Sequence, residues 1–186
     1  MIIGLPGAAF DIVVALILAI HIVIPGTVLM IDEMLPAVAE EKLAVARDFG
    51  ATDGVLASDA KPWRAATRAM GRGADAVIVT VGAIPAYDSA PRYLAAGGRV
   101  IMVGMPHSGD RSSYEPVVLA AIGQGLIGSK MGDVVIQRDI PWMVDLYQQG
   151  RLKLDELISG RWTLEQINEA IADTKSGAAR RNVIVF

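Results

Sequence analysis

Two nearly unbroken apolar runs, Ala76–Val81 and Val100–Val103, constrain the fold of this chain more than any other feature. Both are rich in β-branched residues, which is typical of strands buried on both faces of a sheet. The stretch between them, Ala86–Ala96, has an interrupted helical pattern, so the three segments predict a right-handed strand–helix–strand crossover. A glycine follows each run, Gly82 after the first and Gly104 after the second. Because ligands of open α/β sheets bind beyond the carboxyl ends of the strands, we expect any binding site at these two ends.

The composition narrows the class of protein. The 186 residues are 53% hydrophobic but only 5% aromatic, so Ala, Val, Ile and Leu supply the apolar mass that a buried parallel sheet needs. A formal net charge of −3 argues against a nucleic-acid partner bound mainly by electrostatics. The absence of cysteine excludes disulfides and sulfur-ligated zinc, and His21 and His107 are too few for an all-histidine metal site. It is also compatible with the cytoplasmic location that we expect.

The first forty residues hold a second long apolar stretch. Between residues 12 and 31 only His21 and the Pro25-Gly26-Thr27 segment interrupt it, and its length would cross a bilayer. No Lys or Arg precedes Lys42, so the basic flank of a signal peptide or of a cytoplasmic loop is missing. We therefore favour a buried helix–turn–strand, and keep a membrane anchor over residues 12–31 as the alternative.

Strands and helices alternate along the chain. The expected strands are residues 1–4, 27–31, 54–57, 76–81, 100–103, 125–129 and 181–186, and the expected helices are residues 8–23, 40–49, 63–70, 86–96, 140–149 and 164–175. Thr163 and Gln166 have the spacing of a capping box at the start of the last helix. The alternation predicts an α/β fold with a doubly wound parallel sheet, followed by a C-terminal helix–strand tail.

The turn after the first expected strand, Gly4-Leu5-Pro6-Gly7-Ala8-Ala9, is a candidate dinucleotide-binding turn. Gly4 can make the tight turn and Ala9 permits close helix packing. Pro6 stands where a second glycine is wanted, has no N–H and cannot adopt positive φ, although Gly7 compensates in part. An ordinary turn explains the segment equally well.

Asp32 ends the second expected strand. A carboxylate at this place can accept hydrogen bonds from an adenosine ribose and would repel a 2′-phosphate, which favours NAD over NADP. A solvated acid beside Glu33 is the alternative.

Three strand ends form the third candidate. They are Thr80-Val81-Gly82, Val103-Gly104-Met105 and Gly125-Leu126-Ile127-Gly128. Backbone groups at such ends can bind a nicotinamide carboxamide without a charged side chain, but three apolar strands that need tight turns would have the same sequence. His107 and Asp110 lie in the polar loop that follows the second of them, where we expect a solvated surface pair rather than a catalytic one.

Six segments in the later part of the chain form a series. They are EKLAVARDFGATDGV, GRGADAVIVTVG, AAGGRVIMVGMP, GLIGSKMGD, GRLKLDELISGRWTLEQINEAI and SGAARRNVIVF. From Glu41 onward this series resembles the C-terminal half of the zinc-type, medium-chain alcohol dehydrogenases. The resemblance implies a Rossmann domain that binds NAD(H), in a parent enzyme that interconverts small alcohols with aldehydes or ketones.

The resemblance also implies roles for individual residues. The matching positions are Lys42 near the adenosine ribose, Val103, Gly104 and Met105 at the nicotinamide with Gly125 and Ile127 nearby, and Arg181 at the pyrophosphate. A slip of one residue would put Arg180 in the place of Arg181. The loop-strand Arg111–Pro116 matches the family's dimer-forming edge, so we expect a homodimer.

The departures from the family shape the functional expectation. The family carries its zinc ligands in a domain ahead of the Rossmann fold, and nothing in this sequence resembles that domain. We expect residues 1–40 to be a divergent first strand–helix–strand unit, 41–138 the cofactor-binding core, and 139–186 a tail that in the family packs on the catalytic domain. The expected protein binds NAD(H) and has little or no dehydrogenase activity alone. The alternative is a non-catalytic dinucleotide-binding or scaffold protein.

Overall fold

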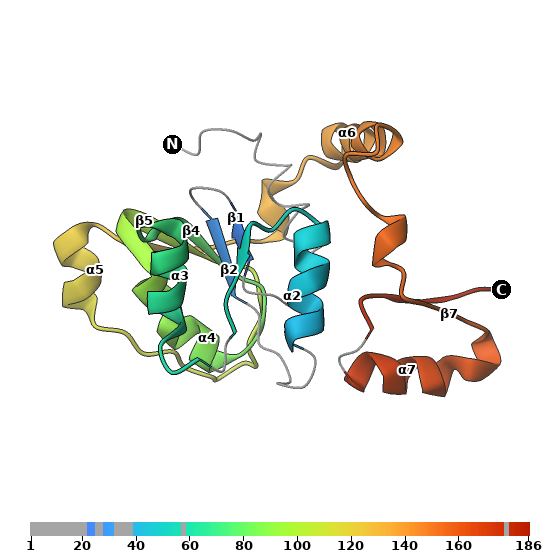
Figure 1. The fold of residues 1–186 in the computed structure, drawn as a ribbon, viewed down its shortest axis with the longest axis horizontal. Helices are drawn as coiled ribbons and strands as arrows, with labels where there is room; N and C mark the ends of the chain where they lie inside the picture. Colours follow the sequence, from blue (N-terminus) through green and yellow to red (C-terminus); the bar gives the residue numbers. More distant parts are fainter. Residues whose placement is uncertain (1–21, 25–27, 32–38, 57–58, 177–178) are drawn as a thin grey trace. The chain divides into compact units, whose positions relative to one another are not determined.

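A computed structural model describes residues 22–24, 28–31, 39–56, 59–176 and 179–186. The described residues form two compact units, which we call the sheet unit (up to Gly132) and the C-terminal unit (from Asp133 to Phe186). Each unit is described by itself (Figure 1). The candidate residues Gly4, Gly7 and Asp32 lie outside the described residues.

The sheet unit is built on a six-stranded sheet with the order β3-β1-β2-β4-β5-β6. Its strands are β1 (Ile22–Ile24), β2 (Val28–Ile31), β3 (Asp53–Gly54), β4 (Ala74–Val79), β5 (Leu94–Met102) and β6 (Gly125–Gly128). Its helices are α2 (Ala39–Asp48), α3 (Pro62–Met70), α4 (Ile84–Ser89), the 3₁₀ turn η2 (Ala90–Tyr93) and α5 (Pro116–Ile122). The 3₁₀ turn η3 (Met131–Asp133) contains the last residue of this unit and the first of the next. The strands β2, β4, β5 and β6 are parallel neighbours, which confirms the predicted α/β class with a parallel sheet.

One strand departs from the prediction. β1 runs antiparallel to both of its neighbours, β2 and β3. Only three residues separate β1 from β2, whereas a parallel pair needs a crossover of a dozen or more residues, so the two strands must run in opposite directions. The helix expected over residues 8–23 is therefore wrong at its end, because Ile22 and Val23 belong to β1.

The same strands bear on the membrane alternative. The described parts of residues 12–31 are β1 and β2, so a spanning helix that continues to residue 31 is wrong. Within the described ranges, no helix has both the length and the apolar character needed to cross a bilayer.

The predicted crossover between the two apolar runs is confirmed as β4–α4–η2–β5 (Figure 1). The helical part is shorter than expected and changes to a 3₁₀ turn at Ala90–Tyr93. Pro91 explains this change, because proline has no N–H to continue an α-helix. A register shift between Ala74 and Ala76 marks an irregularity at the start of β4.

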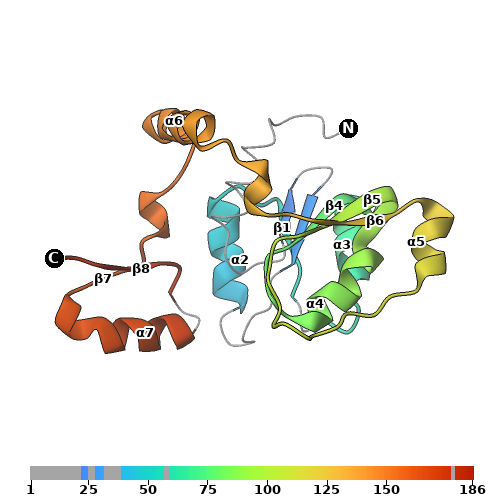
Figure 2. The same cartoon turned by 180° about the vertical axis from the view of Figure 1, so that it is seen from behind.

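The core of the sheet unit lies between β4 and β5 on one side and α3, α4 and η2 on the other. Val77, Val79 and Val100 are at most 1% exposed and pack in one cluster with Ala66 of α3 and Tyr87 of α4. Burying each of these valine side chains stabilises the fold by about 1.5–3 kcal/mol. Figure 2 shows the unit from behind, with β6 beside β5.

The C-terminal unit combines helices with a small parallel sheet of two strands. Its elements are α6 (Ile136–Gln148), η4 (Asp155–Leu157), β7 (Gly160–Trp162), η5 (Leu164–Gln166), α7 (Ile167–Ser176) and β8 (Asn182–Ile184). The predicted capping box is confirmed, and the Thr163 N–H donates to Gln166 Oε1 at 3.2 Å. α6 begins four residues earlier than expected, because the Asp139 carboxylate accepts the Val135 N–H at 2.7 Å and so satisfies the start of the helix.

Candidate functional site

The carboxyl ends of the four parallel strands lie in one row of the sheet. Ile31 pairs with Val79, Val79 with Met102, and Met102 with Gly128. We call the residues that follow this row the carboxyl edge. From β2 the chain goes out to β3 and then returns to β4, so the direction of winding reverses between β2 and β4. Sheets of this kind bind their ligands at such a reversal, beyond the carboxyl ends.

The loops that follow β4 and β5 pack against each other, backbone to backbone. A Cβ atom on Gly82 would lie 2.5 Å from the carbonyl oxygen of Met105, and one on Gly104 would overlap the backbone of Val81. Only glycine permits this approach. The packing of the two loops is thus a sufficient reason for both glycines, independent of any ligand.

Hydrogen bonds fix the end of β5. The N–H groups of Val103 and Gly104 both donate to the Val79 carbonyl, at 3.0 and 2.9 Å. The carbonyl of Gly104 in turn accepts a hydrogen bond from the Tyr87 hydroxyl. The Val103 and Gly104 amides are therefore both used within the sheet unit.

The carboxyl edge combines apolar and polar side chains, since Thr80 follows β4 and Ser129 and Lys130 follow β6. Met105 is 90% exposed and Ile127, next to the end of β6, is 49% exposed, while Val81 and Val103 are half-buried. The apolar residues among them, Val81, Val103 and Met105, suit contact with a flat, uncharged ring.

Three candidate residues lie elsewhere. Gly125 begins β6 and pairs with Arg99, so the structure does not bring it to the carboxyl edge. Lys42 lies in α2. Arg181 is exposed in the C-terminal unit, where its carbonyl accepts the Ser159 N–H at 2.9 Å. The neighbouring Arg180 uses its side chain within that unit, since its Nε donates to the Glu156 carbonyl at 3.2 Å.

The described residues do not fit a zinc site. Among them, no group of three or more His, Asp or Glu side chains lies close enough to hold a metal ion. His107 and Asp110 are both exposed, in a turn closed by the Asp110 N–H to the His107 carbonyl at 3.1 Å, as expected of surface residues.

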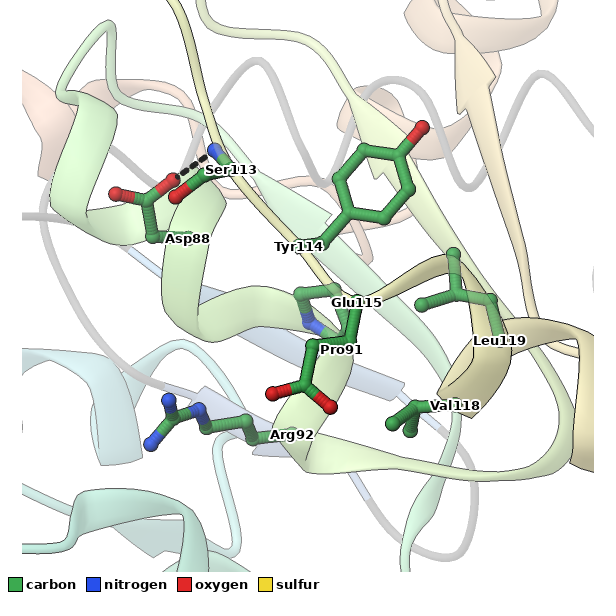
Figure 3. Close-up of a pocket in the computed structure, with 8 residues that line it drawn as sticks. All are labelled: Asp88, Pro91, Arg92, Ser113, Tyr114, Glu115, Val118 and Leu119. Atoms are coloured by element: carbon green, nitrogen blue, oxygen red, sulfur yellow. Dashed lines mark hydrogen bonds between the residues drawn. The ribbon is translucent and has the colours of Figure 1, made fainter.

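A hollow of about 430 Å³ lies between α4–η2 and the loop before α5 (Figure 3). It is lined by Asp88, Pro91, Arg92, Ser113, Tyr114, Glu115, Val118 and Leu119. Asp88 Oδ1 accepts hydrogen bonds from the Ser112 hydroxyl and the Ser113 N–H, each at 2.7 Å. The Arg92 guanidinium lies 4.8 Å from the centre of the Trp63 ring. The sequence analysis missed this hollow, since it forms only where the loop folds back on α4.

The same loop corrects one expectation. Residues 111–115 form no strand, and Pro116 begins α5. The hydrogen bonds to Asp88 hold the loop against α4, which explains why it is not a strand of the sheet. α5 begins at Pro116 because proline is favoured at the first position of a helix. The edge strand of the described sheet on this side is β6 instead.

The strand order, the parallel row and the glycine-lined ends define a doubly wound, Rossmann-like unit. Residues 35–149 match the family described as zinc-binding dehydrogenase, so the chain belongs to that family. The chain corresponds to the family's C-terminal, NAD-binding half, as the resemblance predicted.

Individual relatives agree with this assignment. The chain is 29% identical over 143 residues to an NDMA-dependent alcohol dehydrogenase of Amycolatopsis methanolica, which covers 75% of this chain and 38% of the relative. It is 36% identical over 118 residues to a geraniol dehydrogenase of Castellaniella defragrans, which covers 63% of this chain and 31% of the relative. The chain thus spans less than half the length of these relatives.

Solved structures share the fold. An alcohol dehydrogenase zinc-binding domain protein from Burkholderia ambifaria is similar with a TM-score of 0.77 and 25% identity, over 96% of this chain and 52% of that one. Benzyl alcohol dehydrogenase from Acinetobacter calcoaceticus has a TM-score of 0.75 at 23% identity, over 84% of this chain and 41% of that one, which is a likeness of fold.

Proposed function

We propose that the sheet unit is the NAD(H)-binding part of an alcohol dehydrogenase-like oxidoreductase. The observation that carries the proposal is the row of four parallel strand ends beside the reversal of winding, in a chain of the zinc-binding dehydrogenase family. The relatives named as alcohol and geraniol dehydrogenases support a small alcohol or aldehyde as the substrate of the whole enzyme. When bound, the cofactor supplies the hydride acceptor, and the residues of this chain hold and orient it.

Different residues of the chain are proposed to bind different parts of the cofactor. We propose that the apolar side chains at the carboxyl edge contact the nicotinamide ring, and that Gly82 and Gly104 shape the loops around it. Lys42 and Asp32 are proposed for the adenosine ribose, Gly4 and Gly7 for the first turn, and Arg181 for the pyrophosphate. Asp32 would favour NAD over NADP, because a carboxylate repels a 2′-phosphate.

The chemistry at the alcohol needs a group that the described residues do not offer. In zinc enzymes the metal polarises the reacting oxygen, but no donor cluster is found within the described ranges. A polypeptide of this sequence is therefore proposed to have little or no dehydrogenase activity alone. Oxidation of alcohols with NAD at ordinary enzymatic rates by the purified chain would contradict this.

The C-terminal unit supports a further part of the proposal. Ile136, Ile140 and Val144 of α6 are 46–53% exposed and follow helical spacing, so they form one apolar stripe. We propose that residues 139–186 pack on the catalytic domain in complete enzymes of this family.

A homodimer is proposed for the sheet unit. β6 is an edge strand, and the neighbouring α5 segment exposes Tyr114, Val117, Val118 and Ile122. An edge strand beside exposed apolar side chains is the kind of surface through which a second copy can extend a sheet. Light scattering should give twice the mass of one chain, and a monomer at high concentration would contradict the proposal.

We also propose that the protein is located in the cytoplasm.

Calorimetric titration with NADH tests the binding proposal. The wild-type chain should bind in the micromolar range. Ile127→Asp should weaken binding about tenfold or more, because a carboxylate at the carboxyl edge repels the anionic cofactor and disfavours the ring. Val144→Asp is the matched control, since Val144 is 46% exposed in α6, and it should leave the affinity unchanged. Absence of binding by the wild-type chain would instead favour a scaffold protein.

A further inference from the structure

We propose that Tyr87 is a positioning residue for the nicotinamide end of the cofactor. Its hydroxyl holds the Gly104–Met105 peptide so that the Met105 N–H is presented as a donor to the carboxamide. The inference rests on the proposed NAD(H) binding and adds to it a residue of α4 that no motif in the sequence singled out.

The Tyr87 hydroxyl reaches the carboxyl edge from inside the core. Tyr87 is 9% exposed and its ring packs in the core cluster beneath β4 and β5. Its hydroxyl donates to the Gly104 carbonyl, 17 residues further along the chain. Burial raises the pKa of the Tyr87 hydroxyl, so the group stays protonated and remains a donor at neutral pH.

Gly104 is held at three points, each by a different group. Its N–H donates to the Val79 carbonyl at 2.9 Å, and its Cα lies so close to Val81 that a Cβ would overlap that residue's backbone. The third point is the carbonyl, which Tyr87 binds. The first two contacts act on the N–H and Cα of Gly104, and the close approach of Gly82 acts on the Met105 carbonyl. Tyr87 binds the carbonyl of the peptide between them and so fixes its direction.

The direction of the peptide decides where the next N–H points. All peptide bonds in the described chain are trans, so the Gly104 carbonyl and the Met105 N–H point in opposite directions. With the carbonyl turned toward Tyr87, the Met105 N–H turns away from the core. Met105 is 90% exposed, and its N–H has no acceptor among the described residues.

This donor suits the ligand proposed for the edge. The Val103 and Gly104 amides are occupied by Val79, so the Met105 N–H is the amide of this strand end that remains for a ligand. A carboxamide oxygen accepts such a hydrogen bond, and a donor held in place in advance binds without a further loss of backbone entropy. Phenylalanine at position 87 would keep the ring but leave the Gly104 carbonyl without this donor.

The test compares two ligands and two matched variants. Tyr87→Phe removes the hydroxyl, and Tyr93→Phe removes one from another buried tyrosine of the same core, in η2. Titrations with NADH and with ADP-ribose, which lacks the nicotinamide, separate the two ends of the cofactor. Tyr87→Phe should weaken NADH about threefold to tenfold, the worth of one hydrogen bond, and leave ADP-ribose unchanged. Tyr93→Phe should leave the ratio of the two affinities as in the wild type.

Met105→Pro provides a second variant outside the core. It removes the proposed donor N–H directly, whereas Met105→Ala keeps the N–H and removes only the side chain. Met105→Pro should therefore weaken NADH more than Met105→Ala does and leave ADP-ribose unchanged, even if Tyr87→Phe fails to fold. Unchanged NADH affinity in the folded variants, or an equal loss for both ligands, would overturn the role of Tyr87 alone. A wild-type chain that binds neither ligand would overturn the proposed function as well.

Discussion

The two units bury their apolar side chains to different extents. In the sheet unit, Val77, Val79 and Val100 are at most 1% exposed and share one cluster with two helices. In the C-terminal unit, the α6 stripe of Ile136, Ile140 and Val144 remains about half exposed. The sheet unit therefore carries its own core, whereas the C-terminal unit has an apolar surface that nothing in the described chain covers. The difference indicates that the apolar packing of the described chain is concentrated in the sheet unit.

The same substitution in both units should break this comparison most clearly. Val77→Ala should lower the free energy of unfolding by about 2–4 kcal/mol, because it leaves a cavity beside β5. Val144→Ala should change it by less than about 0.5 kcal/mol, because that side chain is already half exposed. Urea denaturation followed by circular dichroism measures both, and equal losses would show that the two units are buried alike.

Two glycines near the carboxyl ends of β5 and β6, Gly104 and Gly128, sharpen the comparison within the sheet unit. Gly104→Ala should destabilise the protein by about 2–3 kcal/mol, because the new Cβ meets the backbone of Val81. Gly128→Ala is the control, since no atom lies within 4 Å of a Cβ built there, and it should change stability by less than about 0.5 kcal/mol. Thermal unfolding measures the stability of both variants. Equal stability would contradict the close packing of the two loops.

Substitution of the N-cap residue Thr163 in the C-terminal unit should have a smaller effect on stability. Thr163→Ala removes the capping box and should lower stability by about 1 kcal/mol. Thr163→Ser keeps the hydroxyl and should recover most of that loss. Hydrogen exchange of the amides in η5 and α7 measures the change locally, and unaltered exchange in Thr163→Ala would contradict the prediction.

The smallest effect on stability is expected from protonation of the Asp139 carboxylate in the C-terminal unit. Hydrogen bonding to Arg138 lowers the pKa of the buried Asp139 below its ordinary value, although its burial opposes this. A carboxylate whose pKa is lower in the folded state stabilises the fold above its unfolded pKa, and this contribution is lost as pH falls through the folded pKa. The stability difference between wild type and Asp139→Asn should therefore shrink below about pH 4, as equilibrium unfolding at several pH values will show. A constant difference would contradict the lowered pKa.

Features that depend on local pattern could be predicted from the sequence. The crossover from β4 to β5 follows from two β-branched runs, and the Thr163–Gln166 capping box follows from a fixed spacing. The hairpin of β1 and β2 could not be predicted, because a long apolar run has no periodicity that separates a buried helix from buried strands. The early start of α6 depends on where one carboxylate points, which spacing does not reveal.

Some features of the candidate site could also be predicted from the sequence, and others could not. The sequence identified Gly82 and Gly104 as special positions, but it assigned them to a ligand, and the contact between the two loops appears only in three dimensions. The pairing of Gly125 with Arg99 could not be predicted, because the sequence gives no register for β6 against β5. The bond from Tyr87 joins residues on different elements, so no motif contains it.

The reversed direction of β1 has a consequence for how the chain approaches the site. Ile22, the first residue of β1, pairs with Met30, one position before the carboxyl end of β2. β1 therefore begins on the side of the sheet where β4, β5 and β6 end. Cleavage or fusion immediately before Ile22 would therefore alter the chain beside the carboxyl ends of the strands, where we propose that the cofactor binds.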